Sequence, residues 1–304
     1  MQNPAVDTQP KGDAGSCCGP DCCSGDKAAP VGLSAPPPSP GEALKAVVRE
    51  KYGAIAASTQ ASGCCGLESC APQGLEFSFV GDDYARLPGY EKAADLGLGC
   101  GLPTELAGIR PGDTVVDLGS GAGNDVFVAR RAVGEKGRVI GVDMTPEMVE
   151  RAEANNQKLG FANVSFVLGE IEAIPLGAGI ADVVVSNCVL NLVPDKAKAF
   201  REMFRILKPG GHFSVSDIVI QGELPAQVRA ASELYIGCVS GAVSREEYLR
   251  GIALAGFVEV QVQKERPVSV PREVLVAILG EDGTGELEAS GAGAVSVTVY
   301  GKKP

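Results

Sequence analysis

The sequence predicts an α/β fold in which a mostly parallel sheet is covered by helices on both faces. Three observations support this prediction. Short apolar segments alternate with helical patterns from Asp113 onward, the first of these segments runs into a glycine loop, and the second ends in an acidic residue. Alternation of this kind is typical of parallel strands joined by crossover helices, so we expect one sheet of seven strands.

The chain divides into four predicted parts. Residues 1–41 are rich in proline and cysteine and lack phenylalanine and tyrosine, which predicts a flexible tail. Residues 42–110 are expected to form a helical lid region with a thiol-bearing loop, because apolar residues recur at helical spacing over 42–59. The core is predicted over 111–263. A C-terminal extension with a closing strand is predicted over 264–304.

Within the core and the extension, each expected strand is a short apolar run bounded by turn residues. The seven runs are Thr114–Leu118, Arg138–Val142, Val164–Leu168, Ala181–Ser186, His212–Asp217, Val258–Gln263 and Val295–Tyr300. Helices are expected between them, including residues 195–207 and 226–238. A capping box from Ser244 to Glu247 predicts the start of a further helix.

Charge and hydropathy exclude several classes of protein. The 304 residues carry 27 basic and 38 acidic side chains, a net charge of −11, which argues against a nucleic-acid partner bound through its phosphates. No apolar run reaches the roughly 18 residues that a membrane-spanning helix needs. The N-terminal segment has no apolar region typical of a secretory signal. We therefore predict a cytoplasmic protein with neither a membrane nor a nucleic-acid partner.

The ten cysteines and the single histidine, His212, restrict the chemistry. A mechanism that needs several imidazoles is excluded. Without an export signal, a disulfide framework is not expected. The cysteines are better interpreted as thiols that hold a ligand or undergo redox reactions.

The glycine loop predicts a nucleoside-binding site. It reads Gly119-Ser120-Gly121-Ala122-Gly123, is preceded by Asp117, and is followed twenty residues later by Asp143 at the end of the next strand. An acidic residue in that place accepts hydrogen bonds from ribose hydroxyls. The spacing is G-x-G-x-G, whereas a dinucleotide site has G-x-G-x-x-G, so a ligand without a pyrophosphate is favoured.

Further segments resemble class I S-adenosylmethionine-dependent methyltransferases, which have a Rossmann-like sheet. They are Gly169-Glu170-Ile171 after the third strand, Asn187 at the end of the fourth, and Leu207-Lys208-Pro209-Gly210-Gly211 before the fifth. The resemblance implies S-adenosylmethionine as methyl donor. The implied contact residues are Asp117, Gly119, Gly121, Gly123, Asp143, Met144, Glu170, Ile171 and Asn187. Another Rossmann-like nucleotide domain is the alternative.

The cysteine-bearing segments resemble a narrower family, the arsenite methyltransferases. The matching stretches are Ser186–Lys196, Tyr235–Ala242, Gly141–Thr145, Leu98-Gly99-Cys100-Gly101 and Lys51-Tyr52-Gly53. Proteins of this family bind As(III) through three cysteines. The resemblance assigns two of them to Cys188 and Cys238 and the third to either Cys64 or Cys65. An upstream cysteine takes part in the family's redox cycle, but here the upstream thiols lie in the tail.

Thiolates suit this substrate because As(III) is soft and thiophilic. Three thiolates around arsenic leave a lone pair, which can attack the methyl carbon of a sulfonium without a protein base. The protein then mainly positions the reactants. We expect methyl transfer to oxidise arsenic towards As(V), and protein thiols to reduce it while forming a disulfide. An external thiol reductant, thioredoxin or glutathione, would restore the thiols by exchange.

Other interpretations remain open at this stage. Cys188 alone could be a buried apolar cysteine, and Cys70 and Cys100 have no assigned role. The tail thiols Cys17, Cys18, Cys22 and Cys23 could chelate a thiophilic metal, with zinc less favoured, or be incidental. The alternatives for the whole chain are a methyltransferase for another small molecule, such as a quinone or sterol, and a thiol-rich protein that sequesters metalloids.

Overall fold

The computed structural model describes the chain except for residues 1–39, 59–83, 229–240, 269 and 271. By their contacts the residues divide into Met1–Pro37 and Pro38–Pro304, and every described residue lies in the second unit. The predicted tail therefore lies outside the described residues, apart from Pro40 and Gly41. So do the thiol loop and residues 229–238 of the helix expected over 226–238.

The seven predicted strands form one sheet in the order β3-β2-β1-β4-β5-β7-β6. Their bounds are β1 Thr114–Leu118, β2 Arg138–Asp143, β3 Val164–Leu168, β4 Ala181–Asn187, β5 Leu207–Gln221, β6 Val258–Pro267 and β7 Gly293–Lys302. Strands β1 to β5 run parallel, and β7 runs antiparallel to both of its neighbours. The predicted mostly parallel sheet is confirmed, and its strand order reverses between β1 and β4.

Capping residues mark an end of several of the helices. They are α1 Pro40–Ser58, α2 Pro103–Leu106, α3 Asn124–Val133, α4 Pro146–Leu159, α5 Lys196–Ile206, α7 Arg245–Leu254 and α8 Arg272–Ser290, with 3₁₀ turns η1 Tyr84–Arg86 and η2 Leu190–Leu192. Helix α7 starts as predicted, because the Ser244 hydroxyl accepts a hydrogen bond from the backbone N–H of Glu247 at 3.2 Å. Helix α4 has Pro146 in its first turn and ends at Gly160, whose φ is 70°.

Alternate residues of β1 point to opposite faces of the sheet, and both faces are covered. Val115 belongs to an apolar cluster that includes Phe127 of α3. Val116 and Leu118 belong to a second cluster that includes Phe200 of α5. Burial on both faces is expected of parallel strands and explains their nearly continuous apolar sequences.

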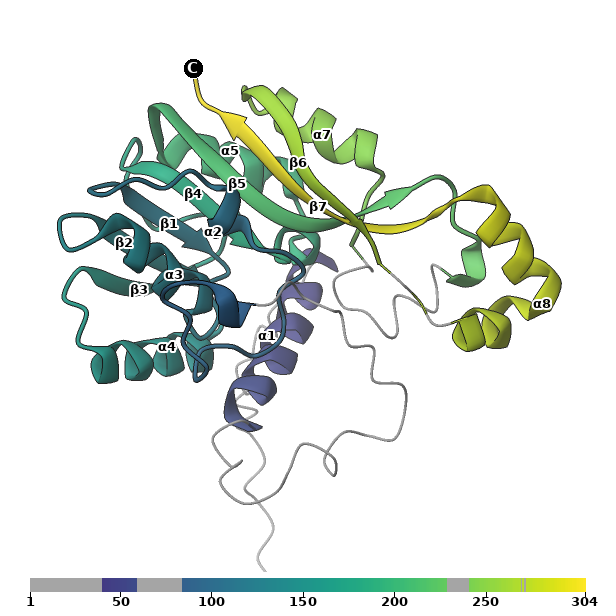
Figure 1. Ribbon diagram of the computed structural model, residues 1–304, viewed down its shortest axis with the longest axis horizontal. Coiled ribbons are helices and arrows are strands. Elements are labelled where there is room, and N and C mark those ends of the chain that lie inside the picture. Colours follow the sequence, from purple (N-terminus) through teal and green to yellow (C-terminus); the bar gives the residue numbers. More distant parts are fainter. Residues whose placement is uncertain (1–39, 59–83, 229–240, 269, 271) are drawn as a thin grey trace, which may run out of the picture. The chain divides into compact units, whose positions relative to one another are not determined.

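The end of the chain is part of this sheet. Strand β6 continues past the boundary predicted at residue 263, and β7 lies between β5 and β6 (Figure 1). The Ser216 hydroxyl of β5 and the Thr298 hydroxyl of β7 are hydrogen-bonded at 2.9 Å in the buried interior. Among the described helices, none combines the length and apolar content needed to cross a bilayer.

Replacing Phe200 tests the packing of α5. Its ring meets that of Tyr248 on α7 edge to face, with centroids 5.5 Å apart, and it is almost fully buried. Phe200→Ala should lower the free energy of unfolding by about 3–5 kcal/mol, because it removes buried surface and leaves a cavity. Urea titration followed by circular dichroism measures this loss. The exposed neighbour Arg201→Ala is the control, and an equal effect of both substitutions would contradict the packing described here.

Candidate active site

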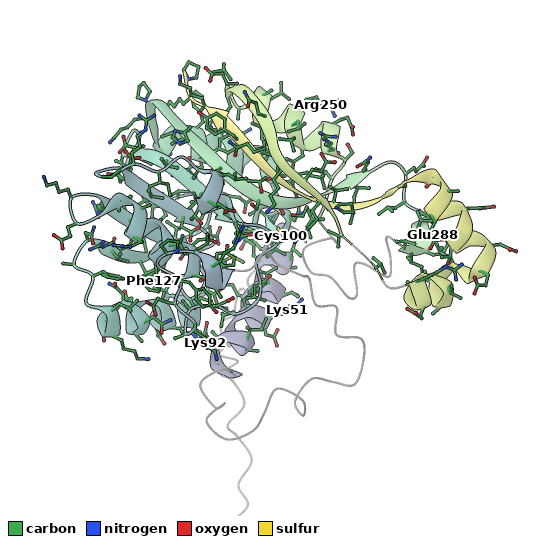
Figure 2. The ribbon with its side chains drawn as sticks, viewed as in Figure 1. Lys51, Lys92, Cys100, Phe127, Arg250 and Glu288 are labelled. Carbon is green, nitrogen blue, oxygen red and sulfur yellow. The ribbon has the colours of Figure 1, made fainter. Side chains whose placement is uncertain are left out.

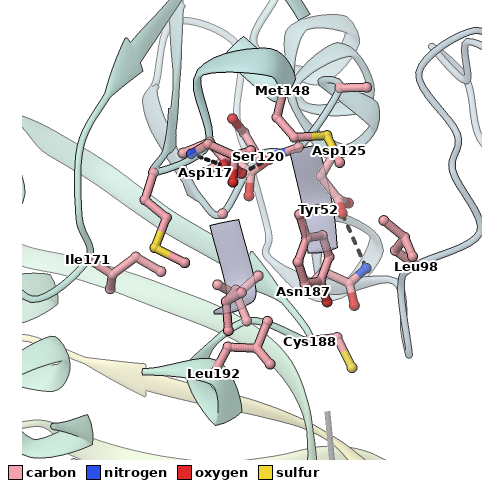
Figure 3. A pocket seen from close by; sticks show the side chains of 18 of the residues that line it. Tyr52, Leu98, Asp117, Ser120, Asp125, Met148, Ile171, Asn187, Cys188 and Leu192 are labelled. Carbon is pink, nitrogen blue, oxygen red and sulfur yellow. Dashed lines mark hydrogen bonds between the residues drawn. The ribbon is translucent and has the colours of Figure 1, made fainter. Parts of the chain in front are cut away.

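A cavity opens at the carboxyl ends of β1, β2 and β4, where the strand order reverses and where open α/β sheets bind their ligands. It contains about 1050 Å³ of empty space, including its open mouth. Its walls come from the glycine loop, from the ends of these strands, from η2 and from α1 (Figure 3). Of the predicted nucleoside contacts, those lining it are Asp117, Gly119, Gly121, Asp143, Met144, Glu170, Ile171 and Asn187.

The three glycines of the loop all have positive φ, but they are needed for two different reasons. A Cβ on Gly119 would lie 2.3 Å from a methyl carbon of Val189, and one on Gly123 would lie 2.8 Å from the Phe127 ring. These two glycines permit close packing. A Cβ on Gly121 would meet no atom within 4 Å, so the loop leaves space for a ligand at that point.

Asp143 is held at the cavity by backbone hydrogen bonds. One carboxylate oxygen accepts from the N–H of Gly121 and the other from the N–H of Thr145, both at 2.9 Å. Burial raises the pKa of Asp143, although these hydrogen bonds oppose the rise. The carboxylate also lines the cavity, where it can accept a ligand hydroxyl. Asp143 is therefore suited to bind a ribose.

Two further polar atoms on the cavity wall lack partners among the described residues. The Ser120 hydroxyl and the side-chain oxygen of Asn124 are buried without a hydrogen bond, and both residues line the cavity. Buried polar groups in native proteins are almost always satisfied. A polar ligand at the glycine loop would satisfy them, so these residues fit the predicted nucleoside.

The cavity wall is acidic. Asp117 is 2% exposed, and its pKa is raised well above its ordinary value by burial and by the nearby carboxylates Asp125 and Asp143. Asp125 also lines the cavity, and burial raises its pKa too. Carboxylates crowded at low dielectric are stabilised by a nearby positive charge. This wall therefore favours a cationic ligand.

Helix α1 is attached to the cavity rim by ion pairs. The Lys45 ammonium lies 2.7 Å from a carboxylate oxygen of Glu170 and 2.8 Å from one of Glu172, and Arg49 lies 2.6 Å from Glu170. The hydrogen bond from Lys45 is the main reason that the pKa of Glu170 is lowered. Lys45 and Tyr52 of α1 line the cavity. The helical part of the predicted lid region thus borders the predicted ligand site.

Cys188 lies in the cavity wall directly after Asn187 (Figure 3). It is 4% exposed, and its backbone N–H donates to the carbonyl of Ser216 at 2.7 Å. Its φ is 60°, which is uncommon for a residue with a side chain and occurs most often at functional sites. The strand end therefore holds Cys188 in the cavity wall in a strained conformation.

Cys100, which the sequence analysis left without a role, belongs to the same buried cluster as Cys188. It is 3% exposed, and Figure 2 labels its position in the fold. The sequence Gly99-Cys100-Gly101 could have indicated the importance of this cysteine, because a thiol between two glycines indicates tight backbone packing.

The other predicted arsenic ligands, Cys64, Cys65 and Cys238, lie outside the described residues, as do Cys70 and the four tail thiols. Within the described ranges, no group of three or more histidine, cysteine, aspartate or glutamate side chains could hold a metal ion. Cys188 is therefore the predicted ligand for which the structure gives a position.

A buried acid that sequence reasoning missed lies near the thiols. Asp217 of β5 is fully buried, and one of its carboxylate oxygens accepts a hydrogen bond from the Tyr248 hydroxyl at 3.4 Å. Burial raises the pKa of Asp217 from 3.8 to about 7. Its only sequence signal was a charged residue at the end of an apolar run.

The raised pKa of Asp217 predicts a pH-dependent stability. Between pH 3.8 and about 7 the native state keeps this proton while the unfolded state loses it. The wild-type free energy of unfolding should therefore fall as pH rises through that window. Asp217→Asn removes the effect, so its stability relative to wild type should increase by about 2–3 kcal/mol from pH 5 to pH 8. Urea unfolding at both pH values measures this, and a constant difference would contradict the assignment.

Comparisons with known proteins agree with this geometry. A family model described as a methyltransferase domain matches residues 109–256. An arsenite methyltransferase of Halobacterium salinarum is 41% identical over 233 residues, which are 73% of this chain and 59% of that protein. The chain thus spans less than two thirds of this relative. A ubiquinone/menaquinone biosynthesis C-methyltransferase of Klebsiella pneumoniae is 37% identical, but over only 36% of this chain.

A solved structure extends the match. The crystal structure of an arsenic(III) S-adenosylmethionine methyltransferase from Chlamydomonas reinhardtii is 36% identical, covers 71% of each chain and superposes with a TM-score of 0.59. The chain belongs to the arsenite methyltransferase family.

Proposed function

We propose that this protein transfers methyl groups from S-adenosylmethionine to trivalent arsenic bound by cysteine thiolates. One observation carries the proposal: Cys188 lines the same cavity as the glycine loop and Asp143. A nucleoside-binding loop and a thiol that can bind a soft metalloid thus share one site. An ordinary small-molecule methyltransferase needs the loop but has no need of the thiol.

The cavity residues suit this methyl donor. Asp143 can accept the ribose hydroxyls, Met144 and Ile171 provide apolar walls for the adenine, and the space beside Gly121 admits the ligand. Asp117 can stabilise the cationic amino acid end. When bound, S-adenosylmethionine supplies an electrophilic methyl group on a sulfonium. Glu170 forms ion pairs with Lys45 and Arg49 of α1 and so holds this helix at the rim of the donor site.

The arsenic substrate is arsenite or one of its thiol conjugates. Each thiolate bond forms as a cysteine S–H replaces an As–O–H group, and the proton leaves with the hydroxide as water. We propose Cys188 and Cys238 as two ligands. For the third, the sequence favours Cys64 or Cys65, whereas burial in the Cys188 cluster supports Cys100. With Cys100 as ligand, Cys64 and Cys65 are left for the redox step.

The protein needs no general base for methyl transfer. The arsenic lone pair forms the As–C bond, and the electron pair of the broken S–CH₃ bond stays on sulfur. Arsenic is thereby oxidised to As(V). We propose that two protein thiols reduce it to As(III) and become a disulfide, which thioredoxin or glutathione reduces by thiol exchange.

Substitution of the thiols tests this function. Cys188→Ser and Cys238→Ser should each lower arsenite methylation more than about 100-fold, because a hydroxyl is a poor ligand for a soft metalloid. Binding of S-adenosylmethionine should change less than about twofold, since it depends on the glycine loop. Mass spectrometry of methylated arsenicals and calorimetry measure the two effects. Cys17→Ser is the control. Retained methylation in either variant would refute the proposal, and robust donor binding by wild type without product would indicate a different acceptor.

The identity of the third ligand has a separate test. If Cys100 is that ligand, Cys100→Ser should weaken arsenite binding without methyl donor at least about tenfold. The double variant Cys64→Ser/Cys65→Ser should bind arsenite normally but lose multiple turnover. The arsenic retained by the protein after gel filtration measures binding. The number of methylated arsenic molecules formed per protein molecule measures turnover. The opposite pattern would assign the third ligand to the Cys64–Cys65 pair.

A further inference from the structure

We propose that Tyr84 and Asp125 are positioning residues that act through Asn187 to hold the Cys100 thiol beside Cys188. The proposal rests on the function above, specifically on Cys100 as an arsenic ligand. It concerns three side chains that come from η1, α3 and the end of β4. They meet in a buried hydrogen-bond network between the cavity and the Gly99-Cys100-Gly101 segment.

Asn187 is the centre of the network. Its side-chain oxygen accepts from the backbone N–H of Cys100 at 3.1 Å and from the Cys100 thiol at 3.8 Å. Its amide nitrogen donates to the carbonyl of Gly101 at 2.8 Å. These partners fix the orientation of the carboxamide, because a flipped amide would place two donors or two acceptors together. Asn187 thus links its own neighbour Cys188 to Cys100.

Tyr84 and Asp125 fix the other side of this carboxamide. The second N–H of the Asn187 amide faces two acceptors, the Tyr84 hydroxyl and, at 3.2 Å, Asp125. Figure 3 labels Asn187 and Asp125. The Tyr84 hydroxyl donates to the same Asp125 oxygen at 2.7 Å, and Thr104 donates to the other oxygen at 3.2 Å. All four side chains are largely buried, so each lost bond would leave a polar group unsatisfied. The network therefore strongly restrains Asn187.

The segment that carries Cys100 has no room to move away. A Cβ on Gly99 would lie 2.8 Å from the amide nitrogen of Asn187, and one on Gly101 would lie 2.5 Å from the Ser216 hydroxyl. On its far side, the carbonyl of Cys100 accepts from the Ser296 hydroxyl at 2.7 Å. The backbone around Cys100 is thus held between β4, β5 and β7.

This arrangement has a consequence for substrate binding. A metalloid bound by several thiolates gains most when the sulfur atoms are already in place, because less conformational entropy is lost. Removing the Tyr84 hydroxyl takes away one acceptor of the Asn187 amide and so loosens the restraint that the carboxamide places on the Cys100 thiol. The expected result is weaker arsenite binding and a higher KM for arsenite, with little change in kcat at saturation.

The experiment compares Tyr84→Phe and Asp125→Asn with the control Tyr300→Phe on β7, all in the full chain. Tyr84→Phe should raise the dissociation constant of arsenite about tenfold, the scale of one buried hydrogen bond. The melting temperature should fall by a few degrees, since a buried bond is lost, while the affinity for S-adenosylmethionine should match the control. Asp125→Asn keeps an acceptor for Tyr84 and nearly the same volume. It should therefore bind arsenite more tightly than Asp125→Ala, a rescue that a purely structural role does not predict.

A second readout separates failure of this inference from failure of the proposed function. Iodoacetamide labelling of Cys100, followed by peptide mass spectrometry, needs no arsenic and should be faster in Tyr84→Phe than in wild type. Wild-type protein that binds no arsenite would refute the function, while faster labelling would still support the positioning. Unchanged labelling and arsenite affinity in Tyr84→Phe would overturn the inference. So would equal losses of arsenite and methyl-donor binding, or misfolding of both Tyr84→Phe and Asp125→Asn.

Discussion

The site depends on the contact between the Asn187 carboxamide and the backbone of Cys100 and Gly101. This contact joins the end of a central strand to the segment that precedes the sheet. Because the flanking residues are glycines, the two backbones approach closely enough to bury both described thiols in one cluster. Without it, the thiol after β4 and the thiol before α2 would lose their most direct link.

The other groups of the site lie in two places according to their chemistry. Carboxylates gather where a cationic donor would bind, and thiols gather where a soft metalloid would bind. Helix α1 closes one side of the cavity through Lys45 and Arg49. The chain has one histidine, and it lies at β5, where its ring contacts the carbonyl of Ala107. The lack of further histidines fits a reaction whose nucleophile is a lone pair already present on the substrate.

Much of the fold could be predicted from the sequence because its signals are local. Apolar runs gave the seven strands, and Ser244 gave the start of α7. The position of β7 between β5 and β6 could not be predicted, since strand order is a long-range property. For the same reason Cys100 and Asp217 were missed: their significance comes from burial beside residues more than 25 positions away in the chain. The glycines that flank Cys100 are visible in the sequence, but the close contacts that require them are visible only in the structure.

A single-turnover reaction tests the central claim most directly. Protein loaded with one equivalent of arsenite is mixed with S-adenosylmethionine, and S-adenosylhomocysteine and methylated arsenic are quantified together by mass spectrometry. The account predicts that the two products appear at the same rate and in equal amounts, and that neither appears with Cys188→Ser. Formation of methylated arsenic by Cys188→Ser at the wild-type rate, or none by wild-type protein that has bound both ligands, would contradict it.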